Sequence, residues 1–287
     1  MENVTFTLNN GVKMPAAGLG VFQVTDRKQC IDAVICAIEN GYRMIDTAAV
    51  YGNEEAVGEA VRLCGVPREQ LFVTSKLWFS DCGYGRAKRA LESSLKKLGL
   101  DYIDLYLIHE PYGWLKRTWR ALEECVDEGK VRAIGVSNFG INDLINIMDD
   151  ARIKPAVDQI ELHPFYQRRE LLGFLREKDI LPEAWAPFAE GKHGIFQSPI
   201  LAEIAGVHGC TAAQVILAWL HAQGVAVIPK SVRPGRIAEN GDFFKVKLSE
   251  SEIAEIDRMD RGASLFPWDK GIRRPLRKLA GFFHLAF

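Results

Sequence analysis

Short apolar runs that end in polar residues recur along the chain, and amphipathic stretches separate them. Apolar side chains return at helical spacing over residues 31–38, 87–98 and 115–126, which predicts helices there. The apolar runs predict strands at Ala17–Gly20, Met44–Asp46, Phe72–Lys76, Ile103–His109, Val131–Ser137, Ala156–Gln159, Leu181–Trp185 and Val225–Lys230.

Strict alternation of strand and helix predicts an α/β fold with a parallel sheet covered by helices. Eight such units close most naturally into a (β/α)8 TIM barrel. The competing doubly wound sheet lacks its phosphate fingerprint GxGxxG, because Val21-Phe22-Gln23 follows Gly18-Leu19-Gly20. The pattern also predicts a short N-terminal hairpin that plugs the barrel, over residues 5–12 with its turn at Asn9-Asn10-Gly11. No linker-like segment divides the chain, so residues 1–287 are expected to form a single barrel domain.

Many of the predicted strands end on a polar residue. In a barrel the C-terminal strand ends form one rim, where barrel enzymes place their chemistry. One such residue would mark only a strand boundary, but several together predict a shared site. These residues are Asp46, Lys76, His109, Ser137, Gln159 and Lys230.

Composition favours a small-molecule partner. The formal net charge of −1 attracts neither nucleic acid nor an anionic membrane. The chain has no apolar run long enough to span a membrane, residues 1–10 lack a signal-peptide pattern, and the 6 cysteines form no CxxC pair. We therefore expect a cytoplasmic protein with reduced thiols. His163 and Glu161 lack metal-site spacing, and GxSxG is missing, so neither a metal site nor a hydrolase is expected.

Distinct motifs stand at the predicted strand ends, and together they resemble one enzyme family. They are Gly41–Glu54 (GYRMIDTAAVYGNE), Thr74–Trp78 (TSKLW), Leu107–His109 (LIH), Gly135–Phe139 (GVSNF), Gln159–Pro164 (QIELHP) and Ile228–Ser231 (IPKS). Over nearly its whole length the chain resembles the aldo-keto reductase superfamily, in particular bacterial enzymes of the 2,5-diketogluconate reductase type. The resemblance implies a carbonyl reductase whose catalytic tetrad is Asp46, Tyr51, Lys76 and His109.

These residue types suit carbonyl reduction, which needs hydride at carbon and a proton at oxygen. Tyr51 can supply the proton if its pKa, ordinarily near 10, is lowered. A cation about 4 Å away contributes roughly 4 kcal/mol at an effective dielectric of about 20, so we expect the charge of Lys76 to outweigh burial. Asp46 keeps the lysine protonated and oriented. His109 is expected to orient the carbonyl oxygen or to share the proton transfer.

The resemblance also implies a nicotinamide cofactor. Lys230 and Arg236 would supply two cations and Ser231 a hydroxyl, and these groups suit the 2′-phosphate of NADPH. No acidic residue matches that position to bind a free ribose hydroxyl, so NADPH is expected over NADH. From the residues alone, a solvated basic loop is an equal alternative. The resemblance implies that Ser137, Asn138 and Gln159 hold the nicotinamide carboxamide, that Trp185 stacks on the ring, that Lys230, Ser231 and Arg236 bind the 2′-phosphate, and that Glu239 and Asn240 contact adenine. The full set of expected cofactor-binding residues is Gly20, Val21, Asp46, Ser137, Asn138, Gln159, Trp185, Ala186, Pro187, Lys230, Ser231, Arg236, Glu239 and Asn240.

Phe22, Trp78 and Phe79 predict apolar walls for the substrate pocket. Glu110 stands where many family members have Trp. If its side chain faces the pocket, its charge disfavours anionic substrates; the alternative is that the side chain points outward into solvent. Residues 271–287 are basic and aromatic, and we expect this tail to dock on the barrel rather than on a membrane or a partner.

The sequence therefore predicts a monomer that reduces an aldehyde or ketone to an alcohol with NADPH and Tyr51. Small aldehydes, ketoaldehydes and keto sugars are the expected substrates. The alternative is an NADPH-binding regulatory or binding subunit with little reductase activity, as in the potassium-channel β subunits similar to this family. Retention of all four tetrad residues favours the enzyme.

Overall fold

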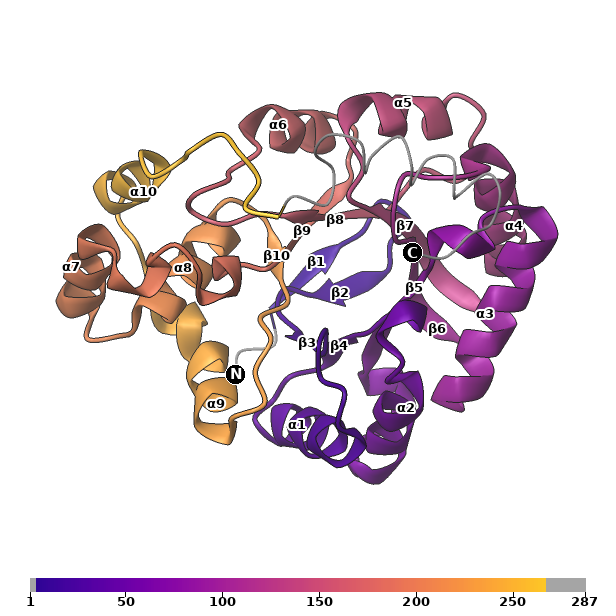
Figure 1. Cartoon of the computed structure of the whole chain (residues 1–287), viewed down its shortest axis with the longest axis horizontal. Coiled ribbons are helices and arrows are strands. Elements are labelled where there is room, and N and C mark those ends of the chain that lie inside the picture. The colour runs from indigo at the N-terminus through magenta and orange to yellow at the C-terminus, as the bar shows by residue number, and fades with distance from the viewer. Residues whose placement is uncertain (1–3, 267–287) are drawn as a thin grey trace.

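The computed structural model describes residues 4–266, which form a parallel barrel wrapped by helices (Figure 1). The eight-stranded sheet has the order β10-β9-β8-β7-β6-β5-β4-β3, and every pairing in it is parallel. Parallel bridges from Ala17 to Val227 and from Gly20 to Lys230 join its two edges. The strands are β3 Leu19–Gly20, β4 Met44–Asp46, β5 Phe72–Leu77, β6 Ile103–Ile108, β7 Val131–Ser137, β8 Val157–Glu161, β9 Leu181–Trp185 and β10 Ala226–Val227.

The predicted (β/α)8 barrel is confirmed. The first and last strands, β3 and β10, are shorter than predicted, whereas β5 and β8 extend beyond their predicted ends, to Leu77 and Glu161. The last strand ends at Val227 because Pro229, which has no backbone N–H, follows closely. Two helices, α7 and α8, fill the wide interval before that strand. The helices are α1 Arg27–Glu39, α2 Glu54–Leu63, α3 Tyr84–Leu98, α4 Leu115–Asp127, α5 Ile141–Met148, α6 Arg169–Glu177, α7 Pro199–His208, α8 Ala212–Ala222, α9 Pro234–Gly241 and α10 Glu250–Asp257.

Alternate side chains of each strand face the barrel interior and the helices. On β8, Val157 belongs to the inner apolar cluster and Ile160 to the cluster under the helices. Several helices start on a capping side chain that satisfies an unpaired N–H: Asp26 accepts from Gln29, and Thr211 accepts from Gln214. The strands that carry the rim are therefore packed on both faces of the sheet.

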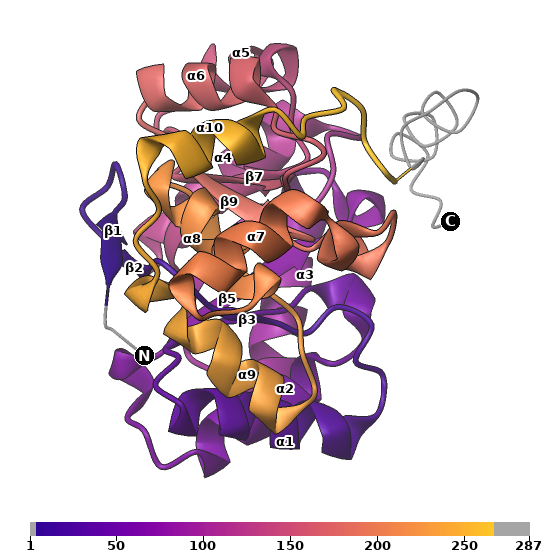
Figure 2. The same cartoon turned by 90° about the vertical axis from the view of Figure 1, so that its left-hand side faces the viewer.

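The N-terminal hairpin closes one end of the barrel, as predicted. Its strands are β1 Thr5–Thr7 and β2 Lys13–Pro15, which pair antiparallel. Leu8 and Met14 are buried in the inner cluster, and the Asn9 amide donates to the carbonyl of Pro155, just before β8. Figure 2 shows the hairpin at one end of the molecule and the chain that follows α10 reaching the other. The opposite end, where the strands finish, is left for a site.

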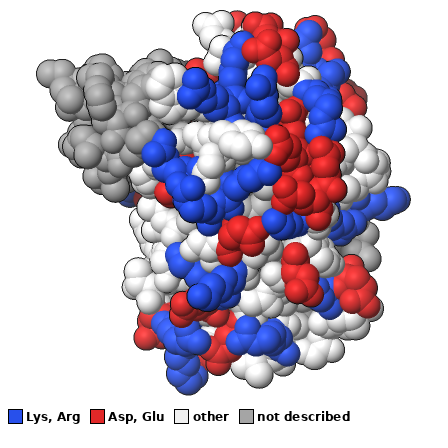
Figure 3. Space-filling view, turned by 90° about the vertical axis from the view of Figure 1, so that its right-hand side faces the viewer, with Lys and Arg blue, Asp and Glu red and all other residues white. Residues whose placement is uncertain are grey.

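The face formed by α3 and α4 carries interspersed charges of both signs (Figure 3). Lys88 pairs with Glu124 and Glu128, and Lys130 pairs with Glu92 and Glu128. Within residues 4–266, no single helix is long and apolar enough to cross a membrane; α7 and α8 pass such a test only as a pair bent by 89°. The expected role of residues 271–287 lies outside the described residues.

Candidate active site

A cleft of about 1530 Å³ opens at the C-terminal ends of the barrel strands. Residues from strand ends far apart in the sequence line it, which is the convergence that the polar strand ends predict. From the predicted set, the lining residues include Asp46, His109, Ser137, Gln159 and Lys230. Lys76 is fully buried and lies behind this wall.

Asp46, Lys76 and Tyr51 form one connected group. The Lys76 Nζ lies 2.6 Å from Asp46 Oδ1, 2.9 Å from the carbonyl oxygen of Thr47 and 3.5 Å from the Tyr51 hydroxyl oxygen. Burial acts to lower the pKa of Lys76, but Asp46 and Tyr51 outweigh it and the pKa rises. The lysine is therefore held as an ammonium that points at the phenol.

A short turn places Tyr51 over this ammonium. Tyr51 ends the 3-10 helix Ala49–Tyr51, and Gly52 follows with φ 69°, a left-handed conformation that favours glycine. Asn53 then fixes the loop: its amide donates to the carbonyls of Val21 and Val24, and its oxygen accepts from the Thr47 hydroxyl. Sequence reasoning missed Asn53, although it directly follows the Tyr-Gly pair.

The pKa of Tyr51 differs from the expectation. Burial raises the pKa of Tyr51 to about 12, and Lys76 lowers it by too little to compensate, while Asp46 adds to the rise. The rings of Phe22 and His109 pack against the phenol at centroid distances of 5.0 and 5.6 Å. The prediction that charge outweighs burial is therefore wrong, and the phenol keeps its proton at neutral pH.

His109 follows β6 and is nearly buried at the floor of the cleft. Burial, with the nearby charge of Lys76, holds the pKa of His109 well below its usual range, so the imidazole is neutral. Its ring meets those of Tyr51 and Trp78 edge-on at 5.6 and 5.1 Å. A neutral imidazole beside the phenol can donate one N–H to a ligand oxygen.

The residues expected to bind nicotinamide lie together in the same cleft. The Trp185 indole donates to Asn138 Oδ1 at 2.8 Å. The Ser137 hydroxyl is buried at the wall and has no hydrogen-bond partner among the described residues. Gly20 also lines the cleft, where a Cβ would approach the Ile228 carbonyl oxygen to 2.9 Å. An aromatic wall and an unpaired hydroxyl suit a planar carboxamide ring.

The residues expected to bind adenosine and phosphate line the other arm of the cleft. Lys230 and Arg236 are exposed there, and Ser231 is buried beside them. Glu239 accepts from the Thr211 hydroxyl at 2.9 Å, which fixes α9 against the start of α8. The cleft is also lined by Asn240, Ala186 and Pro187.

Two expected site residues lie away from the cleft. Val21 is fully buried in the cluster under the helices, where only its backbone serves the site by accepting from Asn53. Phe79 is fully buried against Trp78 and Tyr112. Val21 lies between the lining residues Gly20 and Phe22, and its side chain faces the opposite way. Phe79 instead begins a 3-10 helix, Phe79–Asp81, and its ring packs away from the cleft. Phe22, Trp78 and Glu110 do line the cleft, and Glu110 accepts from the Asn138 amide at 3.2 Å.

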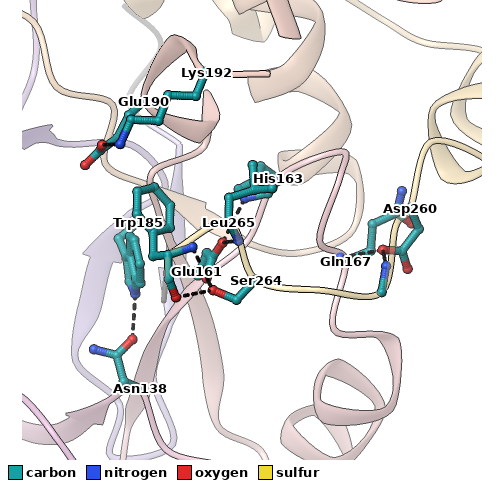
Figure 4. A network of polar contacts seen from close by, with 12 residues as sticks. Asn138, Glu161, His163, Gln167, Trp185, Glu190, Lys192, Asp260, Ser264 and Leu265 are labelled. Carbon is teal, nitrogen blue, oxygen red and sulfur yellow. Dashed lines mark hydrogen bonds and ion pairs between the residues drawn. The ribbon is translucent and has the colours of Figure 1, made fainter. Parts of the chain in front are cut away.

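Glu161 anchors the chain after α10 across the cleft, a contact that sequence reasoning missed. Its carboxyl accepts from the Ser264 hydroxyl at 2.5 Å and from the Leu265 N–H at 2.9 Å (Figure 4). Phe266, the next residue, packs on Trp185 at 5.2 Å between ring centroids. The buried His163 contacts the same carboxyl at 3.1 Å. Glu161 and His163 therefore position residues 264–266, and no cluster of potential metal ligands occurs within residues 4–266.

Glu161→Gln should loosen residues 264–266. Hydrogen bonds to a charged group contribute about 1.5–3 kcal/mol, so losing one should speed amide exchange at Leu265 by roughly 10- to 100-fold. Hydrogen exchange followed by mass spectrometry measures this change, and Glu170→Gln on the exposed start of α6 is the control. Unchanged protection of Leu265 in Glu161→Gln would show that other contacts hold the segment.

Comparisons with known proteins match the chain to one family. Residues 16–261 match the Aldo/keto reductase family. Glyoxal reductase of Bacillus subtilis is 46% identical over 264 residues, covering 92% of this chain and 95% of the relative. Methylglyoxal reductase DkgA of Escherichia coli is 43% identical over 271 residues, covering 93% and 98%. The crystal structure of an aldo/keto reductase from Brucella melitensis superposes with a TM-score of 0.86 at 43% identity, covering 90% of this chain and 100% of that one.

Proposed function

Because this chain belongs to the aldo/keto reductase family, we propose that it reduces an aldehyde or ketone to an alcohol with NADPH and that Tyr51 donates the proton. The observation that carries the proposal is the buried Lys76 ammonium, held 2.6 Å from Asp46 and 3.5 Å from the Tyr51 hydroxyl oxygen. We further propose that it acts as a cytoplasmic monomer on a small carbonyl compound.

The chain's own residues account for the proton half of the reaction. The Tyr51 hydroxyl gives its proton to the carbonyl oxygen, since an alkoxide is a far stronger base than a phenolate. The phenolate that remains lies beside the Lys76 ammonium, which stabilises it. The neutral imidazole of His109 donates an N–H to the same carbonyl oxygen and so orients the substrate. NADPH, when bound, supplies the hydride.

The residues of the cleft fit a nicotinamide cofactor. The unpaired Ser137 hydroxyl and the amides of Asn138 and Gln159 would hold the carboxamide, and Trp185 would cover one face of the ring. Lys230 and Arg236, with the Ser231 hydroxyl, would bind the 2′-phosphate at the other arm. Gly20, Ala186, Pro187, Glu239 and Asn240 would complete the cofactor site.

Arg236→Ala should discriminate between the two nicotinamide cofactors. Losing one charged hydrogen bond to phosphate at an exposed site should raise KM for NADPH about tenfold and leave KM for NADH nearly unchanged. Steady-state kinetics with both cofactors measures the difference, and the control is Lys245→Ala, at an exposed ion pair whose residues do not line the cleft. An equal rise for both cofactors would contradict a phosphate-binding role.

The class of reaction is tested by NADPH oxidation with a panel of aldehydes, α-ketoaldehydes, keto sugars and keto acids. The apolar walls formed by Phe22 and Trp78 favour small uncharged substrates, and Glu110 at the cleft disfavours keto acids. Glyoxal and methylglyoxal come first in the panel, given the names of the relatives. Tight NADPH binding without reduction of any of these compounds would favour a binding subunit instead.

A further inference from the structure

A second buried carboxyl group, that of Glu183, lies next to the Asp46–Lys76 pair. Glu183 is fully buried, in register with Gln159 on β8 and with Ala226 on β10. The Gln159 amide nitrogen lies 2.8 Å from Glu183 Oε2 and 2.8 Å from Asp46 Oδ2. Both amide protons are thus used by carboxyl groups, so the Gln159 oxygen is left to accept from a ligand in the cleft.

The charges of this group do not balance if both carboxyls are ionised. One ammonium, Lys76, faces two carboxyls, and it is paired with Asp46 at 2.6 Å. The Glu183 carboxyl accepts a hydrogen bond only from the neutral amide of Gln159, and its Oε1 has no hydrogen-bond partner among the described residues. Because an uncompensated buried charge is unfavourable, the proton belongs on Glu183 rather than on Asp46.

We propose that Glu183 is a positioning residue of the reductase, whose neutral carboxyl group orients the Gln159 amide and leaves Lys76 to Asp46 and Tyr51. The inference rests on the proposed function. Loss of the Glu183 proton adds a negative charge that competes for Lys76. The Tyr51 phenol then becomes a weaker acid, so reduction slows as the pH rises.

The titration of Glu183 can be separated from that of the neighbouring groups. Burial raises the pKa of Glu183 to about 8, Asp46 adds to the rise, and Gln159 and Lys76 oppose it. The pKa of Tyr51 is higher, at about 12, and that of His109 lies well below its usual range. A decline in rate that begins near the pKa of Glu183 therefore belongs to neither Tyr51 nor His109.

Rates measured across the pH range test this inference with the full chain, NADPH and methylglyoxal. In the unsubstituted protein kcat/KM should fall on the order of tenfold above about pH 8. The cause is the negative charge of deprotonated Glu183, which acts on Lys76 through an effective dielectric of about 20. Glu183→Gln, a neutral group of the same shape, should remove this fall and keep the neutral-pH rate within a few-fold. A fall that persists in Glu183→Gln would overturn the proposal.

NADPH affinity gives a readout that needs no turnover. Glu183→Ala leaves the Gln159 amide without its second acceptor and should weaken NADPH binding about tenfold, while Glu183→Gln should restore it. Quenching of tryptophan fluorescence measures the affinity. If the unsubstituted protein reduces no carbonyl compound but this pattern holds, the proposed function fails and the positioning of Gln159 stands. Equal affinities in all three proteins would overturn the positioning role.

Infrared spectroscopy locates the proton directly. Glu183→Gln should lose a protonated-carboxyl band present in the unsubstituted protein at neutral pH. Asp158, also on β8 but on the helix side of the sheet, is the matched control because burial raises its pKa well above the usual range. Asp158→Asn should remove a different band and leave the pH dependence of kcat/KM unchanged. An unaltered spectrum in Glu183→Gln would overturn the assignment of the proton.

Discussion

Replacement of Tyr51 by phenylalanine is expected to lower kcat/KM for carbonyl reduction by about 10³-fold. General acids contribute roughly 10²- to 10⁴-fold, and the Tyr51 hydroxyl lies 3.5 Å from the Lys76 ammonium at the cleft. The ring remains in Tyr51→Phe, so its contacts with Phe22 and His109 persist. NADPH affinity and thermal stability should therefore change little. Steady-state kinetics measures kcat/KM, and fluorescence titration measures NADPH affinity separately.

Tyr84→Phe is the control for this substitution. Tyr84 lies exposed on α3, donates to Glu124 and does not line the cleft. Its loss should leave kcat/KM unchanged. A Tyr51→Phe protein with undiminished kcat/KM would remove Tyr51 from the mechanism, whatever its position beside Lys76.

The alternation of strands and helices was sufficient to predict the barrel, since each strand has its own apolar run. The rim residues could be predicted for the same reason: the last polar residue of a parallel strand lies at the C-terminal edge. Asp46 and Lys76 come from neighbouring strands, β4 and β5, and their 2.6 Å contact follows from that order. The direction of side chains within loops could not be predicted this way, as Phe79 shows.

Electrostatic magnitudes also lay beyond the sequence. The pKa of Tyr51 depends on how completely its neighbours exclude water, and Phe22 and His109 approach it from other loops. The nearby Lys76 ammonium alone suggested a lowered pKa for Tyr51, whereas burial raises this pKa to about 12. Glu183 left a weaker signal: it is an acidic residue in the middle of the predicted strand Leu181–Trp185. It stands two residues before Trp185 and therefore on the same face of the strand.

Replacement of Lys76 by methionine is expected to abolish activity and to lower the free energy of unfolding by about 3–5 kcal/mol. The stability loss arises because Asp46, which is almost fully buried, would be left as an unpaired charge. Lys28 makes an ion pair of similar length, 2.5 Å to Asp32, but on the exposed surface of α1. Lys28→Met should therefore cause no measurable change, since solvent screens such pairs. Urea denaturation measures the free energy of unfolding of both variants.

The double substitution Asp46→Asn with Lys76→Met separates stability from chemistry. Removing both charges leaves no unpaired ion, so most of the lost free energy of unfolding should return. Activity should not return, because the Tyr51 phenolate would still lack the ammonium that stabilises it. If the double variant were as unstable as Lys76→Met, the unpaired charge of Asp46 would not be the cause. If it regained activity with its stability, Lys76 would serve the fold rather than the reaction.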